Sequence, residues 1–150
     1  MNTSEVRRIL DELPRKSIAV VGDFFIDRYL HIDPALDEPS LETGLTAYQV
    51  TRVRDQAGAA GTVTANLEAL GVGTLFAVAV VGEDGPGMLL RRDLAEKGVQ
   101  LDFLLEDADR LTPTYTKPLR IRPDKPPEEV NRLDVRNRGQ TPPEIEDRLI

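Results

Sequence analysis

Residues 58–71 read GAAGTVTANLEALG, four small residues followed by a segment with helical spacing. Val63, Leu67 and Leu70 recur at intervals of three and four residues, which predicts a helix with these side chains on its buried face. The closing glycine is the residue that most often ends a helix. The stretch therefore predicts a helix that begins where the backbone carries almost no side chain.

Apolar runs lie on both sides of this helix. SIAVVGD at 17–23 and LFAVAVVG at 75–82 show no alternation, which is typical of parallel strands covered on both faces. A second helix is predicted from a cap at Asp84 to a stop at Gly98, and a third strand at 99–106. Strand, helix, strand, helix, strand predicts an α/β fold, with a layered parallel sheet.

The two ends of the chain carry helix signals as well. An amphipathic helix is predicted at 4–13, capped by Ser4. Near the other end, Thr141 and the residues after it form a T-x-x-E capping box, and the sequence ends on two large apolar residues. A helix that has just begun there leads us to expect that the natural fold is truncated at Ile150.

Two insertions, at about 28–54 and 113–135, interrupt the alternation. They contain more polar strand candidates joined by turn-rich segments such as RPDKPP at 122–127. We predict a small, mostly antiparallel sheet that stands off the main body, with Pro118 restricting its strand to an edge or a bulge. Plain surface hairpins are the alternative.

Composition excludes several classes of protein. The 150 residues carry a net charge of −7, which argues against nucleic acid and against a membrane surface as partners. There is no cysteine, and the single histidine, His31, cannot build a metal cluster. The longest apolar run is too short to span a bilayer, so we expect a soluble cytoplasmic protein. No P-loop occurs, and no G-x-G-x-x-G follows the first strand.

Two features suggest a ligand. Small residues before a helix let a ligand touch the backbone, where free amide groups donate hydrogen bonds, although they also permit close packing of helix on sheet. Asp23 and Asp27 follow the first predicted strand, and the carboxyl ends of strands are where open α/β sheets bind ligands. A carboxylate there can accept hydrogen bonds from sugar hydroxyls. A turn cap and a solvated charge are the alternative.

Several separated motifs together resemble a known family. VVGDFFIDRY, the small-residue stretch ending in NLEALGVG, AVVGEDGPGMLLRRDLAEKGV, TPTYTKPLRI and NRLDVRN are similar, in order and spacing over 17–136, to the N-terminal half of ribokinase-like (PfkB) carbohydrate kinases. The similarity is greatest to the bacterial heptose phosphate kinase branch. The resemblance implies that 1–150 is part of one kinase domain, with 28–54 and 113–135 as a β-sheet lid that often also makes a dimer contact.

The resemblance also implies site residues. Asp27, Gly58 and Ala59 would line the sugar site, with Thr62 where the family has Asn. Lys117, on the lid, would either meet a sugar phosphate or remain a solvated charge. The catalytic aspartate, the ATP site and its Mg²⁺ belong to the family's C-terminal half, so no catalytic residue and no metal site are expected in this chain.

Departures from the family pattern keep a second function open. Ala59 replaces a glycine, Thr62 replaces an amide, and 35–45 does not match the heptose kinases. The first hypothesis is ATP-dependent phosphorylation of a sugar or sugar phosphate, for which this chain supplies the sugar-binding and lid half. The alternative is a non-catalytic carbohydrate-binding or assembly module with half of the fold.

Overall fold

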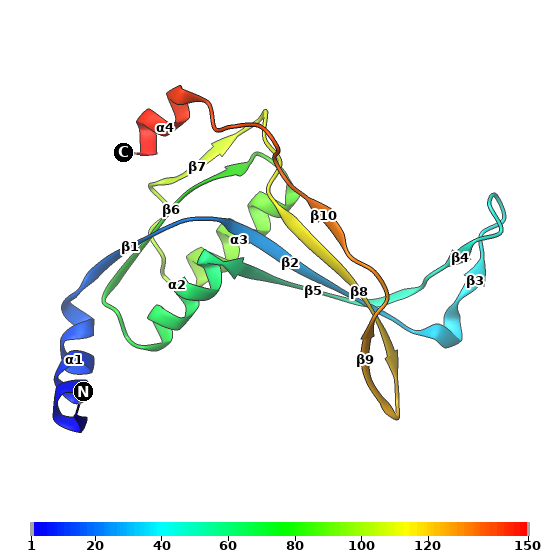
Figure 1. Ribbon diagram of the computed structural model, residues 1–150, viewed down its shortest axis with the longest axis horizontal. Coiled ribbons are helices and arrows are strands. Elements are labelled where there is room, and N and C mark those ends of the chain that lie inside the picture. The colour runs from blue at the N-terminus through cyan, green and yellow to red at the C-terminus, as the bar shows by residue number, and fades with distance from the viewer. Residues whose placement is uncertain (1, 150) are drawn as a thin grey trace.

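The computed structural model describes residues 2–149, which form a mixed α/β body with a long sheet projecting from it (Figure 1). The helices are α1 (Thr3–Glu12), α2 (Ala60–Ala69), α3 (Gly85–Glu96) and α4 (Pro143–Leu149), with 3₁₀ turns η1 (Leu13–Arg15) and η2 (Pro34–Leu36). The strands are β1 (Ser17–Val21), β2 (Phe24–Ile32), β3 (Glu38–Pro39), β4 (Thr46–Ala47), β5 (Val50–Ala59), β6 (Thr74–Gly82), β7 (Leu104–Asp107), β8 (Thr114–Arg122), β9 (Lys125–Glu129) and β10 (Leu133–Val135).

The predicted parallel sheet is confirmed. Its strand order is β1-β6-β7, with both pairs parallel, and α2 and α3 lie in the crossovers between its strands. The core gathers around the central strand β6 and is completed by α3 and the start of β2. Its fully buried members include Phe24, Ile26, Ala77, Leu90 and Leu94.

Two sequence predictions about the packing of this body were wrong. β1 is not covered on both faces: alternate residues are exposed, and Val21 is 76% exposed, because nothing in residues 2–149 packs on its outer face. α2 buries Ala60, Gly61 and Thr64 instead of Val63 and Leu70. The small side chains let this helix approach the sheet, which turns the larger ones outward.

The third strand is shorter than predicted. β7 begins at Leu104, and only an isolated bridge between Phe76 and Gln100 precedes it. The helix ends follow the sequence more closely. α3 is capped by Asp84, whose carboxylate accepts the Gly87 amide at 2.8 Å. In α1 the capping residue is Asn2, not Ser4, with Glu5 completing the box.

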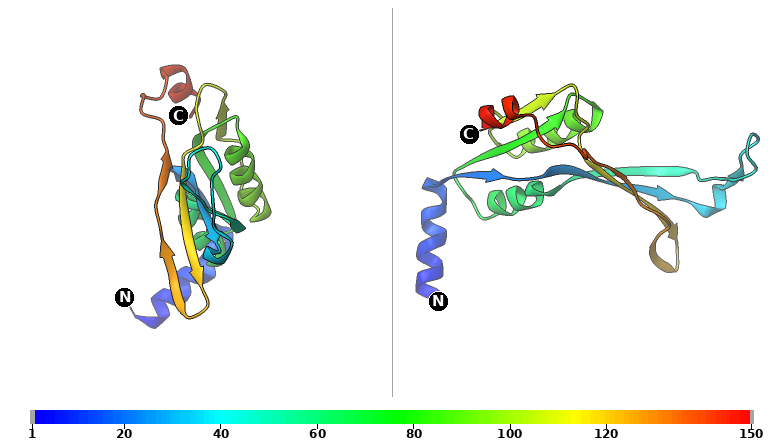
Figure 2. Two further views of the ribbon diagram at one scale, coloured as in Figure 1. Left: turned by 90° about the vertical axis from the view of Figure 1, so that its right-hand side faces the viewer. Right: turned by 45° about the horizontal axis from the view of Figure 1, so that its top comes forward.

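A second sheet stands off the body, as predicted (Figure 2). Its order is β10-β8-β2-β5, with β9 also paired to β8; β2 and β8 run parallel and the other pairs are antiparallel. We call it the lid sheet. It begins at Phe24, directly after β1, and not at residue 28. Beyond it, β3 and β4 form a two-stranded arm at the far end (Figure 1).

The prediction for Pro118 was wrong, because β8 is an interior strand of the lid sheet. The carbonyl oxygen of Pro118 accepts a hydrogen bond from the Val130 amide at 2.9 Å. In a strand the nitrogen and the carbonyl of one residue point to the same side, so the Pro118 nitrogen, which has no hydrogen to donate, faces this side too. That side lies between β9, which ends at Glu129, and β10, which begins at Leu133. The proline is therefore tolerated where the neighbouring strand changes. The predicted turn at 122–127 is also shorter, since β9 includes two of its three prolines, Pro126 and Pro127.

Within residues 2–149 we find no helix with the length and apolar character needed to cross a membrane.

Candidate functional site

The register of the lid sheet separates its side chains onto two faces. Successive residues of a strand point to opposite faces, and residues paired in register share a face. One face, here called the Asp27 face, carries Phe25, Asp27 and Tyr29 of β2, Gly58, Gln56 and Arg54 of β5, and Tyr115 and Lys117 of β8. The opposite face carries Ile26 and the Arg28–Asp55 ion pair, which is 2.8 Å long.

Asp27 and Lys117, predicted separately, form one ion pair. Lys117 Nζ donates to Asp27 Oδ1 at 2.5 Å, and the two side chains are only 20% and 16% exposed. The hydrogen bond to Asp27 raises the pKa of Lys117 above its ordinary value. Lys117 is thus not the solvated charge that the sequence allowed. A ligand that hydrogen-bonds to Asp27 must share that carboxylate with the lysine or displace it.

Aromatic rings extend the Asp27 face in both directions. Lys117 Nζ lies 5.0 Å from the centroid of the Tyr29 ring, and Arg54 covers the same ring at 4.3 Å. Towards the body, Phe25 meets Tyr115 edge to face, with ring centroids 4.5 Å apart. The face therefore offers carboxylate, cation and aromatic surface within a few residues of one another.

Packing explains two of the small residues in the 58–61 stretch. A Cβ on Gly58 would lie 2.0 Å from Cε2 of Phe25, and a Cβ on Gly61 would lie 2.3 Å from the Ala57 methyl group. Both distances are far below van der Waals contact, so neither position accepts a side chain without movement. The close-packing interpretation of these glycines is therefore sufficient, whatever ligand binds nearby.

Ala59 has no such packing reason. It is exposed, precedes α2 as its N-cap, and adopts φ 41° and ψ −108°. That backbone region is the mirror image of the β region, which glycine enters freely and alanine does not. The next amide, of Ala60, donates to the Asp23 carbonyl at 3.1 Å, which ties the start of α2 to the turn between β1 and β2.

Thr62 lies apart from the Asp27–Lys117 pair. Its hydroxyl donates to the Ala57 carbonyl at 3.2 Å, and it lines a hollow of about 230 Å³ together with Asp93 and Lys97 of the α3 region. The structure thus brings Asp27, Lys117 and Gly58 onto one face, with Ala59 at its edge. It does not bring Thr62 into a common pocket with Asp27.

A hollow at the base of the Asp27 face contains residues that the sequence did not identify. We call it the base hollow; its volume is about 220 Å³, and it is lined by Asp23, Phe25, Arg110, Pro113, Tyr115, Arg136 and Asn137. Asp23 was singled out with Asp27, but the arginines were missed. Arginines in polar, turn-rich segments are usually solvated, and only the pairing of β10 with β8 brings Arg136 here.

The loop that carries Arg110 is fixed to the body. The Thr112 hydroxyl accepts the Gly82 amide at 2.9 Å, and Asp84 Oδ2 accepts the Thr112 amide at 2.9 Å. Burial opposes ionisation of Asp84, but the hydrogen bonds from Thr112 and Gly87 outweigh it and lower the pKa of this carboxyl. The helix cap and the loop anchor are therefore the same side chain.

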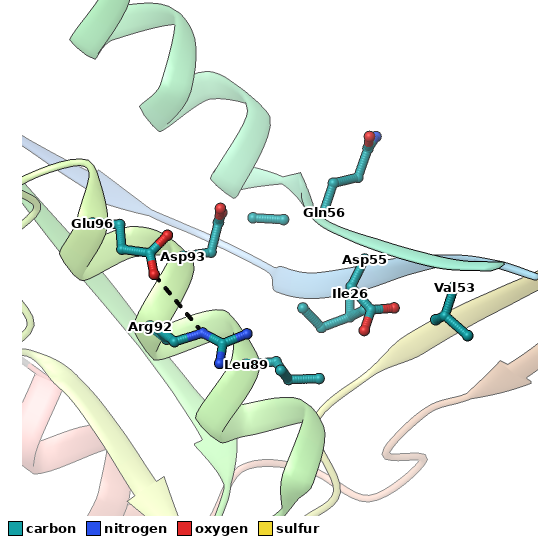
Figure 3. A pocket seen from close by; sticks show the side chains of 9 residues that line it. Ile26, Val53, Asp55, Gln56, Leu89, Arg92, Asp93 and Glu96 are labelled. Carbon is teal, nitrogen blue, oxygen red and sulfur yellow. Dashed lines mark ion pairs between the residues drawn. The ribbon is translucent and has the colours of Figure 1, made fainter.

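A further hollow of about 270 Å³ lies on the other side of the lid sheet, between β5 and α3 (Figure 3). Its acidic side chains already have cationic partners. Asp55 pairs with Arg28, Asp93 with Lys97, and Glu96 with Arg92 at 3.9 Å. Asp27 is paired in the same way with Lys117, so ion pairing does not separate this hollow from the Asp27 face. Among residues 2–149 no cluster of three metal-ligating side chains occurs.

Comparison with known proteins places these features in a family context. The bifunctional protein HldE of Citrifermentans bemidjiense is 35% identical over 119 residues, which are 79% of this chain and 24% of that protein. The D-beta-D-heptose 7-phosphate kinase of Bordetella bronchiseptica is 34% identical over 102 residues, 68% of this chain and 31% of that protein. The chain spans about a quarter of the length of the curated relatives that it matches first.

The fold is also similar to that of a solved structure. A carbohydrate kinase from Agrobacterium tumefaciens superposes with a TM-score of 0.59 and 27% identity, over 80% of this chain and 35% of that one. No family model matches the chain.

Proposed function

We propose that this chain, which belongs to the ribokinase-like (PfkB) carbohydrate kinase family, holds the sugar acceptor of an ATP-dependent phosphoryl transfer. In this proposal, residues 1–150 are the sugar-binding and lid part of one kinase domain. The chain positions an acceptor hydroxyl, and the rest of the full-length protein supplies the catalytic base and the site for ATP and Mg²⁺. We place the enzyme in the cytoplasm, where ATP is available.

Asp27 is the observation that carries the proposal. It is a partly buried carboxylate on the Asp27 face of the lid sheet. Two neighbours on that face, Phe25 and Tyr115, line the base hollow together with a second carboxylate, Asp23. Ionised carboxylates accept two directional hydrogen bonds, which suits a pair of sugar hydroxyls. Lys117 holds the carboxylate in one place until the sugar arrives.

The acceptor is a sugar or sugar phosphate. Heptose 7-phosphate, named for the Bordetella relative, belongs among the compounds to test. The segment at 35–45, which includes β3 and the turn that leads to β4, departs from the heptose kinase sequence pattern and is the part of the lid where we expect acceptor choice to differ.

The experiment is acceptor-dependent ATP consumption by the full-length protein over a panel of sugars and sugar phosphates. With an accepted compound, Asp27→Asn should lower kcat/KM by about 10- to 150-fold, because hydrogen bonds to a charged group contribute about 1.5–3 kcal/mol. Asp55→Asn is the matched control, since Asp55 lies on the adjoining strand but on the opposite face. Equal effects of the two substitutions would remove Asp27 from the site.

The strained alanine supports the alternative of a non-catalytic carbohydrate-binding module. Ala59 adds a methyl group at the position where the family has glycine, in a backbone conformation that disfavours it. Saturable sugar binding by the full-length protein, without any acceptor-dependent ATP consumption, would favour the module over the kinase.

A homodimer through the lid sheet is also part of the proposal. The face of the lid sheet opposite Asp27 carries three exposed apolar residues, Val53, Leu133 and Val135, whose exposed fractions are 54%, 57% and 39%. Burying such side chains against a second copy would remove apolar surface from water. Light scattering of the full-length protein tests this part.

A further inference from the structure

Two arginines that are 26 residues apart in sequence line the base hollow together. Arg110 comes from the loop before β8, and Arg136 follows β10. The proposed function as stated uses neither. Their positions are held by Asn137, whose side-chain amide donates to the Leu111 carbonyl at 2.7 Å and accepts the Leu111 amide at 3.1 Å. This bridge joins the two segments directly beside both arginines.

The guanidinium charge of Arg110 forms no ion pair with any carboxylate among residues 2–149. No carboxylate in the described part of the chain lies within 4.0 Å of its guanidinium group, and its buried Nε has no hydrogen-bond partner there. Its Nη1 reaches only the Gln140 carbonyl, at 3.5 Å. A buried guanidinium nitrogen without an acceptor is costly, so the position favours a ligand that supplies one.

Arg136 is also incompletely neutralised. It shares Asp134 with Arg132: Arg136 Nη2 is 2.8 Å from Asp134 Oδ2, and Arg132 donates to both oxygens at 2.8 and 3.0 Å. Two guanidinium groups on one carboxylate leave a positive charge. The guanidinium of Arg136 also lies 4.9 Å from the centroid of the Tyr115 ring, which limits its orientation.

We propose that the base hollow is an oxyanion subsite, in which Arg110 and Arg136 bind a phosphate group of a ligand that also reaches Asp27. The planar guanidinium group of an arginine can donate two parallel hydrogen bonds to the oxygens of a phosphate, which the ammonium group of a lysine cannot do. Asp23, in the same hollow, would repel a phosphate beside it, so we place the phosphate at the arginines and a hydroxyl of the same ligand at Asp23.

The subsite adjoins the proposed acceptor site. Tyr115, which lines the hollow, is the register partner of Asp27, and Phe25 lies two residues before Asp27 on the same face. One ligand can therefore contact both. The inference rests on the proposed function for the identity of that ligand: either the acceptor's own phosphate or the phosphoryl group that is transferred supplies the same chemistry.

The first experiment needs no turnover. Inorganic phosphate is titrated calorimetrically into the full-length protein and into Arg110→Gln, Arg136→Gln and Arg138→Gln. Arg138 is exposed and does not line the hollow, so it controls for loss of one nearby positive charge. We expect saturable binding that weakens at least about tenfold in the first two variants and by less than about twofold in the third. No saturable binding, or equal losses in all three variants, would overturn the subsite.

A second comparison separates the two sources of phosphate and guards against misfolding. Arg110→Lys keeps the charge but loses the fork, so it should melt like the wild type while binding phosphate more weakly; full retention of affinity would contradict bidentate binding. If Arg110→Gln weakens the binding of a phosphorylated sugar and not that of its unphosphorylated counterpart, the acceptor's phosphate occupies the hollow. If it weakens the binding of ATP instead, the phosphoryl group that is transferred occupies it. Arginine-dependent phosphate binding in a protein without sugar kinase activity would retain the subsite and reject the proposed function.

Discussion

Ala59→Gly should stabilise the protein, although replacing alanine by glycine usually destabilises it. Ala59 is exposed and adopts φ 41° and ψ −108°, where an L-residue is strained. A residue other than glycine in such a backbone region lowers the free energy of unfolding by roughly 1–3 kcal/mol. The extra freedom that glycine gives the unfolded chain costs about 0.4–1 kcal/mol. The difference is a net stabilisation of about 1 kcal/mol.

The assay is urea unfolding of the full-length protein. With a dependence of about 1–3 kcal/mol per molar of urea, the midpoint should rise by roughly 0.3–1 M. Ala65→Gly is the matched control, because Ala65 lies inside α2, where glycine costs about 1 kcal/mol, so its midpoint should fall. A fall of the same size for Ala59→Gly would refute the strain that we assign to this residue.

Two further substitutions test the packing and the electrostatics. Gly58→Ala places a methyl group 2.0 Å from the Phe25 ring, which packs against Tyr115, and should lower the unfolding free energy by about 1–3 kcal/mol. Gly139 has open space around it, so the control Gly139→Ala should change the unfolding free energy by less than about 0.5 kcal/mol. Equal effects of the two substitutions would contradict the contact between residue 58 and Phe25. Asp84→Asn tests the lowered pKa of Asp84. A carboxyl whose pKa is lower in the folded state than in the unfolded state stabilises the fold above about pH 4, and this stabilisation is lost as the pH falls through the folded-state pKa. The difference in unfolding free energy between the wild type and the variant should therefore shrink in acid. A difference that stays constant with pH would count against ionised Asp84 as the anchor of the loop.

Local signals were enough to predict the body of the fold. The apolar runs identified β1 and β6, and the cap at Asp84 fixed the start of α3. What failed depended on the environment of the whole chain. The exposed face of β1 and the interior place of Pro118 follow from which strands lie alongside, and no local pattern records that.

The site was predicted in the same partial way. Asp27 stands out because it follows the first strand, yet the structure puts it inside β2, paired with a lysine 90 residues away. The convergence of Arg110 with Arg136 depends on the pairing of β10 with β8 and on the amide bridge from Asn137. Polar residues in turn-rich segments give no sequence signal for either contact.

The central claim is that the Asp27 face of the lid sheet binds the sugar. The most direct measurement is a crystal structure of the full-length protein with an accepted sugar or sugar phosphate. The account predicts ligand hydroxyls within hydrogen-bond distance of the Asp27 carboxylate, with Lys117 shared or displaced. A ligand bound instead in the hollow between β5 and α3, with the Asp27–Lys117 pair intact and unoccupied, would contradict it.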